Sequence, residues 1–300
     1  MTMAQTADHR PVSPLIASSR GGPTVWRVLL GAQLRRLREE AGISRDDAAY
    51  AIRASVSKMC RLELGRVGFK ERDVADLLTM YGVVDEDERA GLMTLVRRAN
   101  EPQWWQPYGD IMPSWFEQYV GLEEAAVRLR TYATQFVPGL LQTEDYAFAV
   151  ARLRHPHAST QELERRVELE MTRQRLLTRP EAPKLWTVID EAALRRRLGG
   201  AAVLRGQLRR VLEVSALPNV TVQILPFDRG VGAPGGPFTI LRFQEPDLPD
   251  VVYVEQLDSA AYLDRRSDLD LYGRTMDTLC AQACVPGETP AFIERLLADL

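Results

Sequence analysis

Side chains that could contact a nucleic acid cluster in one short stretch of this 300-residue sequence. The candidates are Arg45, Arg53, Ser55, Val56, Ser57, Lys58 and Arg61. Arg61 could donate two hydrogen bonds to a guanine, Ser57 could bond a base edge or a phosphate, and Val56 could contact a thymine methyl group. Arg45 and Arg53 would reach phosphates, which fix the register of a protein on DNA without reading its sequence. The predicted chemistry is recognition of double-stranded DNA through its major groove.

The charge of the chain is unevenly distributed. The whole sequence has a net charge of −3, which by itself argues against a nucleic-acid-binding protein. Residues 27–72, however, contain 11 Lys or Arg against 6 Asp or Glu, whereas residues 101–300 contain 22 against 28. A basic segment of +5 therefore precedes an acidic segment of −6. Such a basic segment can also be a solvated helical face, so the spacing of the residues has to decide.

Residues 26–100 have the spacing of five short helices. The first is expected to end at Gly42 and the third at Gly65, while Ser44 and Ser55 are the expected N-caps of the second and third. Apolar residues at helical spacing are Val28, Leu29, Leu30, Leu34 and Leu37 in the first helix and Met59, Leu62 and Leu64 in the third. Two further helices are expected at 71–81 and 86–98. This order predicts a helix-turn-helix, whose third helix enters the major groove by its N-terminal end.

The stretch 43–65 resembles the helix-turn-helix of phage-repressor-like regulators of the XRE type. The matching features are the opening Ile43–Ser44, the small Ala49, the cap Ser55 and the closing Leu62–Glu63–Leu64–Gly65. Two positions depart from that family, which often has Gln where Arg45 stands and Gly where Arg53 stands. The first departure should raise the salt sensitivity of binding, and the second places a side chain in the turn. The resemblance implies a sequence-specific DNA-binding domain.

The rest of the chain predicts an α+β domain with a small antiparallel or mixed sheet. Expected strands lie at 185–189, 220–225, 238–243, 251–256 and 260–263. Single helices are expected at 144–154, 161–177, 269–283 and 290–300, and a pair of helices within 192–216. The predicted fold class is thus a mainly α five-helix N-terminal bundle followed by this α+β domain. The predicted organisation is a disordered leader at 1–25, a DNA-binding domain at 26–100, an aromatic linker at 101–122 and a regulatory or dimerisation domain at 123–300.

The expected linker is rich in aromatic residues. They are Trp104, Trp105, Tyr108, Trp115, Phe116 and Tyr119. A stacking platform for single-stranded nucleic acid would interleave such rings with basic residues, and residues 101–123 contain no Lys or Arg. Aromatic anchors that dock the linker onto a larger domain are therefore the better interpretation.

The second half also resembles a known family. Its blocks include PSWFEQYVGLE, YATQFVPGLLQTEDYA, DEAALRRRLGG, LPNVTVQILPF, GPFTILRF and DVVYVE. Together they are similar to the C-terminal domain behind XRE-type helix-turn-helices in many actinobacterial regulators, described as toxin–antitoxin-like. The resemblance implies regulation by protein–protein contact, in that family often with a small acidic partner protein encoded nearby. The domain has no defined molecular activity in that family.

The motifs that could indicate catalysis, a cofactor or a metal site are better explained as structural features. Gly230–Gly235 fits a dinucleotide-binding pattern, but a predicted strand follows it where a phosphate-binding helix is needed, so we expect a hairpin loop and no cofactor. Asp190 and Glu191 precede a helix and are expected to cap it rather than to act as acid and base. The remaining candidates are His155, His157, Cys280 and Cys284, which lack the further ligands of a metal site. We therefore expect a protein that is not an enzyme.

Cysteine content and hydropathy suggest where the protein acts. Cys60, Cys280 and Cys284 are too few for a disulfide framework, which favours a reducing cytoplasm. No apolar run approaches the roughly 18 residues that cross a bilayer. The function predicted from the sequence is a cytoplasmic transcriptional regulator that binds a double-stranded DNA operator as a homodimer. The alternative is an antitoxin-like protein that mainly binds a small partner protein and uses DNA binding for autoregulation.

Overall fold

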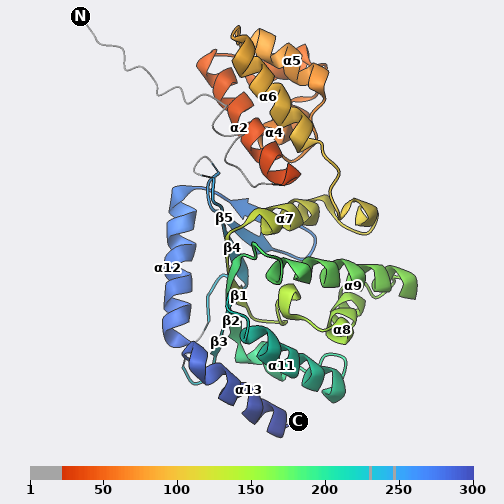
Figure 1. Ribbon diagram of the computed structural model, residues 1–300, viewed down its shortest axis with the longest axis vertical. Coiled ribbons are helices and arrows are strands. Elements are labelled where there is room, and N and C mark those ends of the chain that lie inside the picture. Colours follow the sequence, from red (N-terminus) through yellow and green to blue (C-terminus); the bar gives the residue numbers. More distant parts are fainter. Residues whose placement is uncertain (1–21, 230–231, 246–247) are drawn as a thin grey trace, which may run out of the picture. The chain divides into compact units, whose positions relative to one another are not determined.

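The computed structural model describes residues 22–229, 232–245 and 248–300 (Figure 1). Within these residues the chain forms two compact units. One contains the helices before Trp104, and the other contains residues 105–243 and 249–300. Each unit has its own buried core and is described by itself.

The described residues of the first unit form five helices, as the sequence predicts. They are α2 Pro23–Glu40, α3 Arg45–Ala51, α4 Val56–Glu63, α5 Glu71–Met80 and α6 Glu86–Ala99. Helix α2 begins within the segment expected to be a disordered leader, because proline is well suited to the first helical position and Val25 and Trp26 are buried. The first 21 residues of that leader lie outside the described residues.

Helices α2 and α4 approach each other so closely that only glycine fits between them. A Cβ atom on Gly31 of α2 would lie 2.6 Å from the carbonyl oxygen of Leu62 in α4. A Cβ atom on Gly65, just after α4, would lie 2.6 Å from the Cα atom of Val28 in α2. The backbone of α2 therefore supports α4 directly, and this contact fixes how α4 presents its other face.

The second unit is built on a mixed six-stranded sheet in the order β3-β2-β1-β4-β5-β6. Its strands are β1 Arg128–Ala133, β2 Lys184–Asp190, β3 Val220–Leu225, β4 Phe238–Arg242, β5 Val251–Glu255 and β6 Ala260–Leu263. Strands β1, β2 and β3 are mutually parallel, whereas β1–β4, β4–β5 and β5–β6 are antiparallel pairs. The predicted fold class, a helical N-terminal bundle followed by an α+β domain, is confirmed. The central strand β1 was not predicted.

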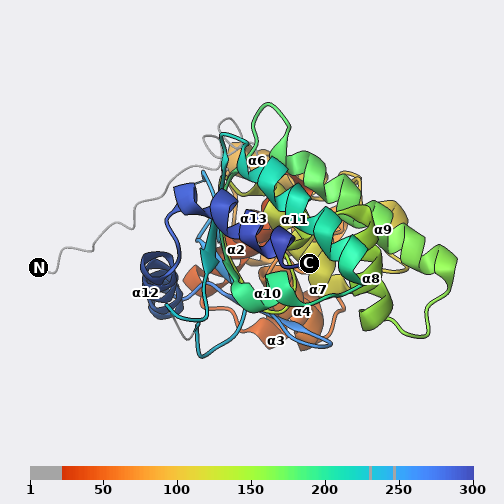
Figure 2. The same ribbon diagram turned by 90° about the horizontal axis from the view of Figure 1, so that it is seen from below.

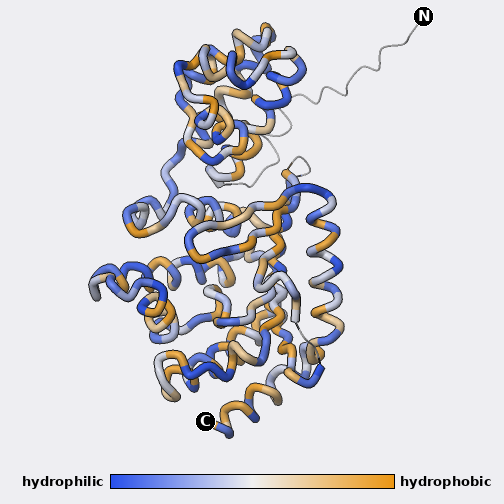
Figure 3. The backbone as a smooth tube through the Cα atoms, turned by 180° about the vertical axis from the view of Figure 1, so that it is seen from behind, coloured by the Kyte–Doolittle hydropathy of each residue, from blue (hydrophilic) through white to orange (hydrophobic). Residues whose placement is uncertain are grey.

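Helices cover the two faces of the sheet unequally. The helices are α7 Ser114–Ala125, α8 Glu144–Arg154, α9 Thr160–Gln174, α10 Glu191–Arg195, α11 Ala201–Ser215, α12 Arg266–Gln282 and α13 Thr289–Ala298. Figures 1 and 2 show α12 on one side of the sheet and α7, α8, α9 and α11 on the other. The strands between them are mainly hydrophobic (Figure 3). On the side of α12, Tyr132, Val188 and Phe238 pack in one core with Met276 and Leu279.

Two connections differ from the expectation. The segment after β3 is not a hairpin loop, because β3 and β4 are not neighbours and the chain crosses from one side of β2 and β1 to the other. Residues 230–231 of the predicted Gly230–Gly235 loop lie outside the described residues. Helix α7 begins at Ser114, inside the expected aromatic linker. Its Tyr119 packs on the sheet with its ring 4.1 Å from that of Tyr253, in keeping with an anchoring role for the aromatic residues.

Candidate nucleic-acid interface

Local hydrogen bonds fix the ends of the two helices that form the candidate interface. The Ser44 hydroxyl accepts a hydrogen bond from the backbone N–H of Asp47 at 3.1 Å, at the start of α3. The Ser55 hydroxyl accepts one from the N–H of Lys58 at 3.1 Å, at the start of α4. Both caps stand where the sequence predicts them, and each satisfies a backbone donor that a helix end would otherwise leave unpaired.

The turn between these helices requires an unusual backbone conformation. Arg53 has φ of 53° and is the only non-glycine residue with a positive φ among the described residues. The N–H of Ala54 donates to the carbonyl of Ala49 at 2.9 Å, which closes the end of α3 as a glycine-ended helix would. A turn whose backbone geometry favours glycine is thus formed here with an arginine in the left-handed region, at a cost of about 1–2 kcal/mol.

Helix α4 separates a buried face from an exposed one. Met59 and Leu62 are buried against the bundle, with exposed fractions of 0% and 3%. The exposed predicted contact residues are Arg53, Ser55, Val56, Ser57 and Arg61. Arg61 and Arg53 have no ion-pair partner among the described residues, so their guanidinium groups are available to a ligand. Small side chains in the exposed first turn of α4 and a basic side chain in its last turn are suited to base edges and phosphates.

Lys58 is less available to DNA than the neighbouring predicted contact residues. Its ammonium group lies 3.5 Å from a carboxylate oxygen of Asp73 in α5, and the side chain is half-buried. This contact ties the start of α4 to α5. A phosphate would have to compete with Asp73 for Lys58, so we expect it to contribute less to DNA binding than Arg61.

Arg45 takes part in an ion network that the sequence did not reveal. Its Nε donates to Glu63 Oε2 at 3.0 Å, while Arg38 Nε donates to Glu63 Oε1 at 2.5 Å. Glu63 and Arg38 are buried, and the hydrogen bond to Glu63 is the main reason that the pKa of Arg38 is raised. Arg38 also donates to the carbonyl of Ile43 at 2.9 Å. The network links α2, α3 and α4, so Arg45 has a structural role besides the predicted phosphate contact.

The exposed surface extends beyond the predicted residues. Tyr50 on α3 is 86% exposed, and Arg66 and Lys70 are exposed in the segment between α4 and α5. Arg66 and Lys70 directly follow the predicted helix-turn-helix at 43–65, and the local charge count could have identified them as further contact residues. Tyr50 had no such signal, because one tyrosine in a short helix is compatible with burial or exposure.

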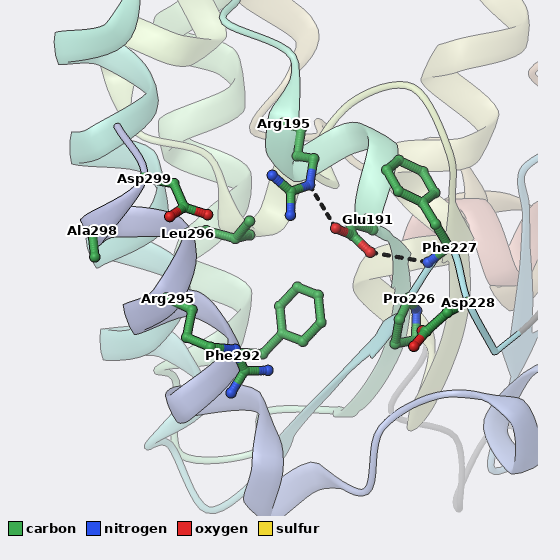
Figure 4. A pocket seen from close by; sticks show the side chains of 10 residues that line it. All are labelled: Glu191, Arg195, Pro226, Phe227, Asp228, Phe292, Arg295, Leu296, Ala298 and Asp299. Atoms are coloured by element: carbon green, nitrogen blue, oxygen red, sulfur yellow. Dashed lines mark hydrogen bonds and ion pairs between the residues drawn. The ribbon is translucent and has the colours of Figure 1, made fainter.

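The strongest candidate for chemistry in the second unit is a cavity at the carboxyl ends of β2 and β3. It has a volume of about 510 Å³ and is lined by residues of α10, α13 and the segment after β3 (Figure 4). The Asp190 side chain accepts from the N–H of Ala192 at 2.9 Å, which confirms the expected cap. Glu191 accepts from the N–H of Phe227 at 2.9 Å and from Arg195 at 2.5 Å. Both carboxylates are therefore engaged in holding α10 and the segment after β3.

The described residues contain neither a cluster of metal ligands nor a helix that could span a membrane. No group of three or more His, Cys, Asp or Glu side chains is arranged to hold a metal ion among the described residues. Burial is the main cause of a lowered pKa at His155 and of a raised pKa at Cys280 and Cys284. None of the helices in the described part of the chain is both long and apolar enough to span a bilayer.

Each unit contains a region that matches the model of a known family. Residues 29–92 match the family model of a helix-turn-helix domain, which contains α3, α4 and the turn between them. Residues 116–295 match the family described as domain of unknown function DUF5753. A search of curated proteins found no match, and neither did a search of solved structures. Because the second match covers more than half of the sequence, the chain belongs to the DUF5753 family, in which it carries a helix-turn-helix domain ahead of the family domain.

Proposed function

We propose that this protein is a sequence-specific DNA-binding regulator of transcription that acts as a dimer. The observation that carries the proposal is the exposed face of α4, on which Ser57 in the first turn and Arg61 in the last turn have no hydrogen-bond or ion-pair partner among the described residues, while Met59 and Leu62 fix the opposite face in the core. The match to a helix-turn-helix domain supports DNA binding by this face. Dimerisation is proposed because one such module buries only about 600–1,000 Å² of protein surface on DNA, at the lower end of specific interfaces.

Genome-wide mapping of DNA bound by the full chain would test this function directly. We expect enriched sites that share a motif with two-fold symmetry, with the promoter of the protein's own gene as the first region to inspect. Purified protein should then bind that motif at least a thousandfold more tightly than unrelated DNA at physiological salt. Bound DNA without a shared motif would contradict sequence-specific regulation.

In this proposal the second unit binds and does not catalyse. Asp190 and Glu191, the carboxylates best placed for acid–base chemistry, already accept backbone hydrogen bonds. We propose that the unit dimerises, binds an effector or binds a partner protein, as the family resemblance implies.

The antitoxin-like alternative is favoured by one observation on the otherwise acidic second unit: Arg128 and Lys184 are exposed on neighbouring strands and have no ion-pair partner among the described residues. Isolation of the full chain from its native host would test this alternative. Recovery of a small protein in a constant ratio would support it, and isolation of a homodimer alone would count against it.

A further inference from the structure

One cavity of the second unit has the size and position of a small-molecule site. It lies at the carboxyl ends of the parallel strands β2 and β3, between α10, α13 and the segment after β3 (Figure 4). Its volume of about 510 Å³ falls within the range of about 300–1,000 Å³ that is typical of ligand pockets. In open α/β sheets, ligands bind outside the carboxyl ends of the strands. We call this space the α10–α13 cavity, and all residues that line it belong to the second unit.

Two phenyl rings from different elements give the α10–α13 cavity apolar surface. Phe292 of α13 is buried, as is Leu296 one turn further along the same helix. Phe227, in the segment after β3, is 62% exposed, and its backbone N–H donates to Glu191 at 2.9 Å. The backbone at Phe227 is thereby held in place while its ring faces solvent. Aromatic rings attract a flat aromatic partner more strongly than the buried area alone accounts for, so the two rings suit an aromatic ligand.

The cavity also contains a guanidinium group whose terminal nitrogens are unused. Arg195 Nε donates to Glu191 at 2.5 Å, but Nη1 and Nη2 have no hydrogen-bond partner among the described residues. The side chain extends from α10 toward α13 (Figure 4). Glu191 is buried and also accepts from the N–H of Phe227, so it fixes the orientation of the guanidinium group. The two terminal nitrogens of such a group can donate parallel hydrogen bonds to one carboxylate.

The remaining charged groups limit the charge that a ligand can carry. Arg295 lines the cavity from α13 and has no ion-pair partner among the described residues. Asp228 and Asp299 line it as well, and both are exposed. Together with Glu191 and Arg195 they give the lining a net charge of −1. A single negative charge can pair with a guanidinium group, whereas a second one would be repelled by the aspartates.

We propose that the α10–α13 cavity binds a small aromatic monocarboxylate. The carboxylate accepts hydrogen bonds from Nη1 and Nη2 of Arg195, and the aromatic ring lies against Phe292 and Phe227. One bound molecule thus connects α10, α13 and the segment after β3. The proposal rests on the proposed function in one respect, that the second unit binds a ligand, and it names the chemical class of that ligand.

The test is isothermal titration calorimetry of the full chain with 2-naphthoate. We expect a dissociation constant of about 1 mM, which a ligand of about 13 non-hydrogen atoms reaches at ordinary ligand efficiency. Cyclohexanecarboxylate keeps the charge but has no aromatic ring, and it should bind about threefold more weakly or worse. 2-(Aminomethyl)naphthalene, which is a cation, and inorganic phosphate, which has no ring, should show no measurable binding.

Two substitutions separate the contact with the carboxylate from the contact with the ring. Arg195→Gln should weaken the binding of 2-naphthoate and of cyclohexanecarboxylate by about tenfold or more, because hydrogen bonds to charged groups are the strong ones. Phe227→Leu should weaken the binding of 2-naphthoate by about threefold and change that of cyclohexanecarboxylate little. The matched control is Arg197→Gln, which removes an exposed cation that does not line the cavity and should leave both affinities unchanged.

Several outcomes would overturn the proposal. They are no binding of 2-naphthoate by the unchanged chain, equal binding by Arg195→Gln, tighter binding of the amine than of 2-naphthoate, and binding of phosphate. Arg195 also holds Glu191, so Arg195→Gln could lower the stability of the fold. Phe227→Leu then decides, because the Phe227 side chain is largely exposed and its replacement leaves the core intact.

Operator binding without ligand separates this proposal from the proposed function. The substituted residues all lie in the second unit, so the operator affinity of the variants should equal that of the unchanged chain. If the chain binds an operator but not 2-naphthoate, only the assignment of the cavity is wrong. If it binds 2-naphthoate but no operator, the proposed DNA-binding function is wrong and the assignment of the cavity is supported.

Discussion

Arg61 and Arg45 carry the same charge in different surroundings. Arg61 is exposed on α4 with no ion-pair partner among the described residues, whereas Arg45 is half-buried and holds Glu63 at 3.0 Å. An arginine that reads a base and one that contacts a phosphate also differ in how their loss depends on DNA sequence. The two residues can therefore be separated by experiment.

Replacement of Arg61 by alanine should weaken operator binding by about 1–3 kcal/mol and relax specificity at one base pair. Arg45→Ala should weaken binding to all sequences alike and reduce the salt dependence by about one phosphate contact. Titrations of operator and scrambled DNA at several salt concentrations measure both effects. If operator binding survives both substitutions unchanged, the assigned reading face is wrong.

Arg53 offers a test of the turn. Its φ of 53° is favourable for glycine, so Arg53→Gly should raise the free energy of unfolding by up to about 1 kcal/mol. Arg53→Ala removes the same charge but keeps a side chain in the left-handed region, and it should bring no such increase. Urea denaturation of both variants measures the difference. Equal stability of the two variants would show that the turn is not strained.

The role of a single residue is easier to predict when its hydrogen-bond partner lies close to it in the sequence. Ser44 and Ser55 were identified as caps because each bonds a backbone group three residues away. The sequence indicates Glu63 only as part of a closing motif, because its partners Arg38 and Arg45 are 25 and 18 residues away. No periodicity in the sequence connects residues of three different helices.

At the level of whole elements, the contact between α2 and α4 depends on Gly31. A Cβ atom there would meet two carbonyl oxygens of α4, so Gly31→Ala should push the helices apart and destabilise the bundle by about 1–3 kcal/mol. The matched control is Gly206→Ala in α11, where nothing lies within 4 Å and alanine should stabilise the helix by up to about 1 kcal/mol.

Thermal unfolding followed by circular dichroism, together with operator binding, measures the effect of both glycine substitutions. Gly31→Ala should lower operator affinity as well, because α2 supports the helix that carries Arg61. If Gly31→Ala is as stable as the unchanged chain, helices α2 and α4 can move apart without loss of stability.

Strands of the second unit were predictable to different degrees. Strands β2 to β5 are mostly apolar runs, and turn residues bound them. Strand β1 has the sequence RLRTYA, in which basic residues alternate with apolar ones, so it does not look like the centre of a sheet. Its neighbours β2 and β4 are distant in sequence, and the parallel order could not be derived from local pattern.

At the scale of the whole molecule, the charge asymmetry should influence DNA binding even without contact. The basic segment of +5 is attracted to DNA and the acidic segment of −6 is repelled. A fragment of residues 22–104 has a net charge of +1, against −3 for the full chain, so it should bind unrelated DNA more tightly than the full chain at low salt, and the difference should shrink as salt rises. Electrophoretic mobility shifts of both proteins on the same DNA measure this. Equal binding at low salt would show that the acidic unit has no such effect.

Dimeric binding makes a geometric prediction about the operator. Two helix-turn-helix units that read the same side of the duplex require half-sites about 34–36 Å apart, one turn of DNA, or a multiple of that distance. Insertion of 5 base pairs between the half-sites rotates one of them to the opposite side of the duplex and should reduce affinity to that of a single half-site. Insertion of 10 base pairs restores the orientation and should recover part of the loss if the two DNA-binding units can separate. A complex with one chain per operator, measured by light scattering, together with equal affinity for all three spacings, would show that the protein binds as a monomer.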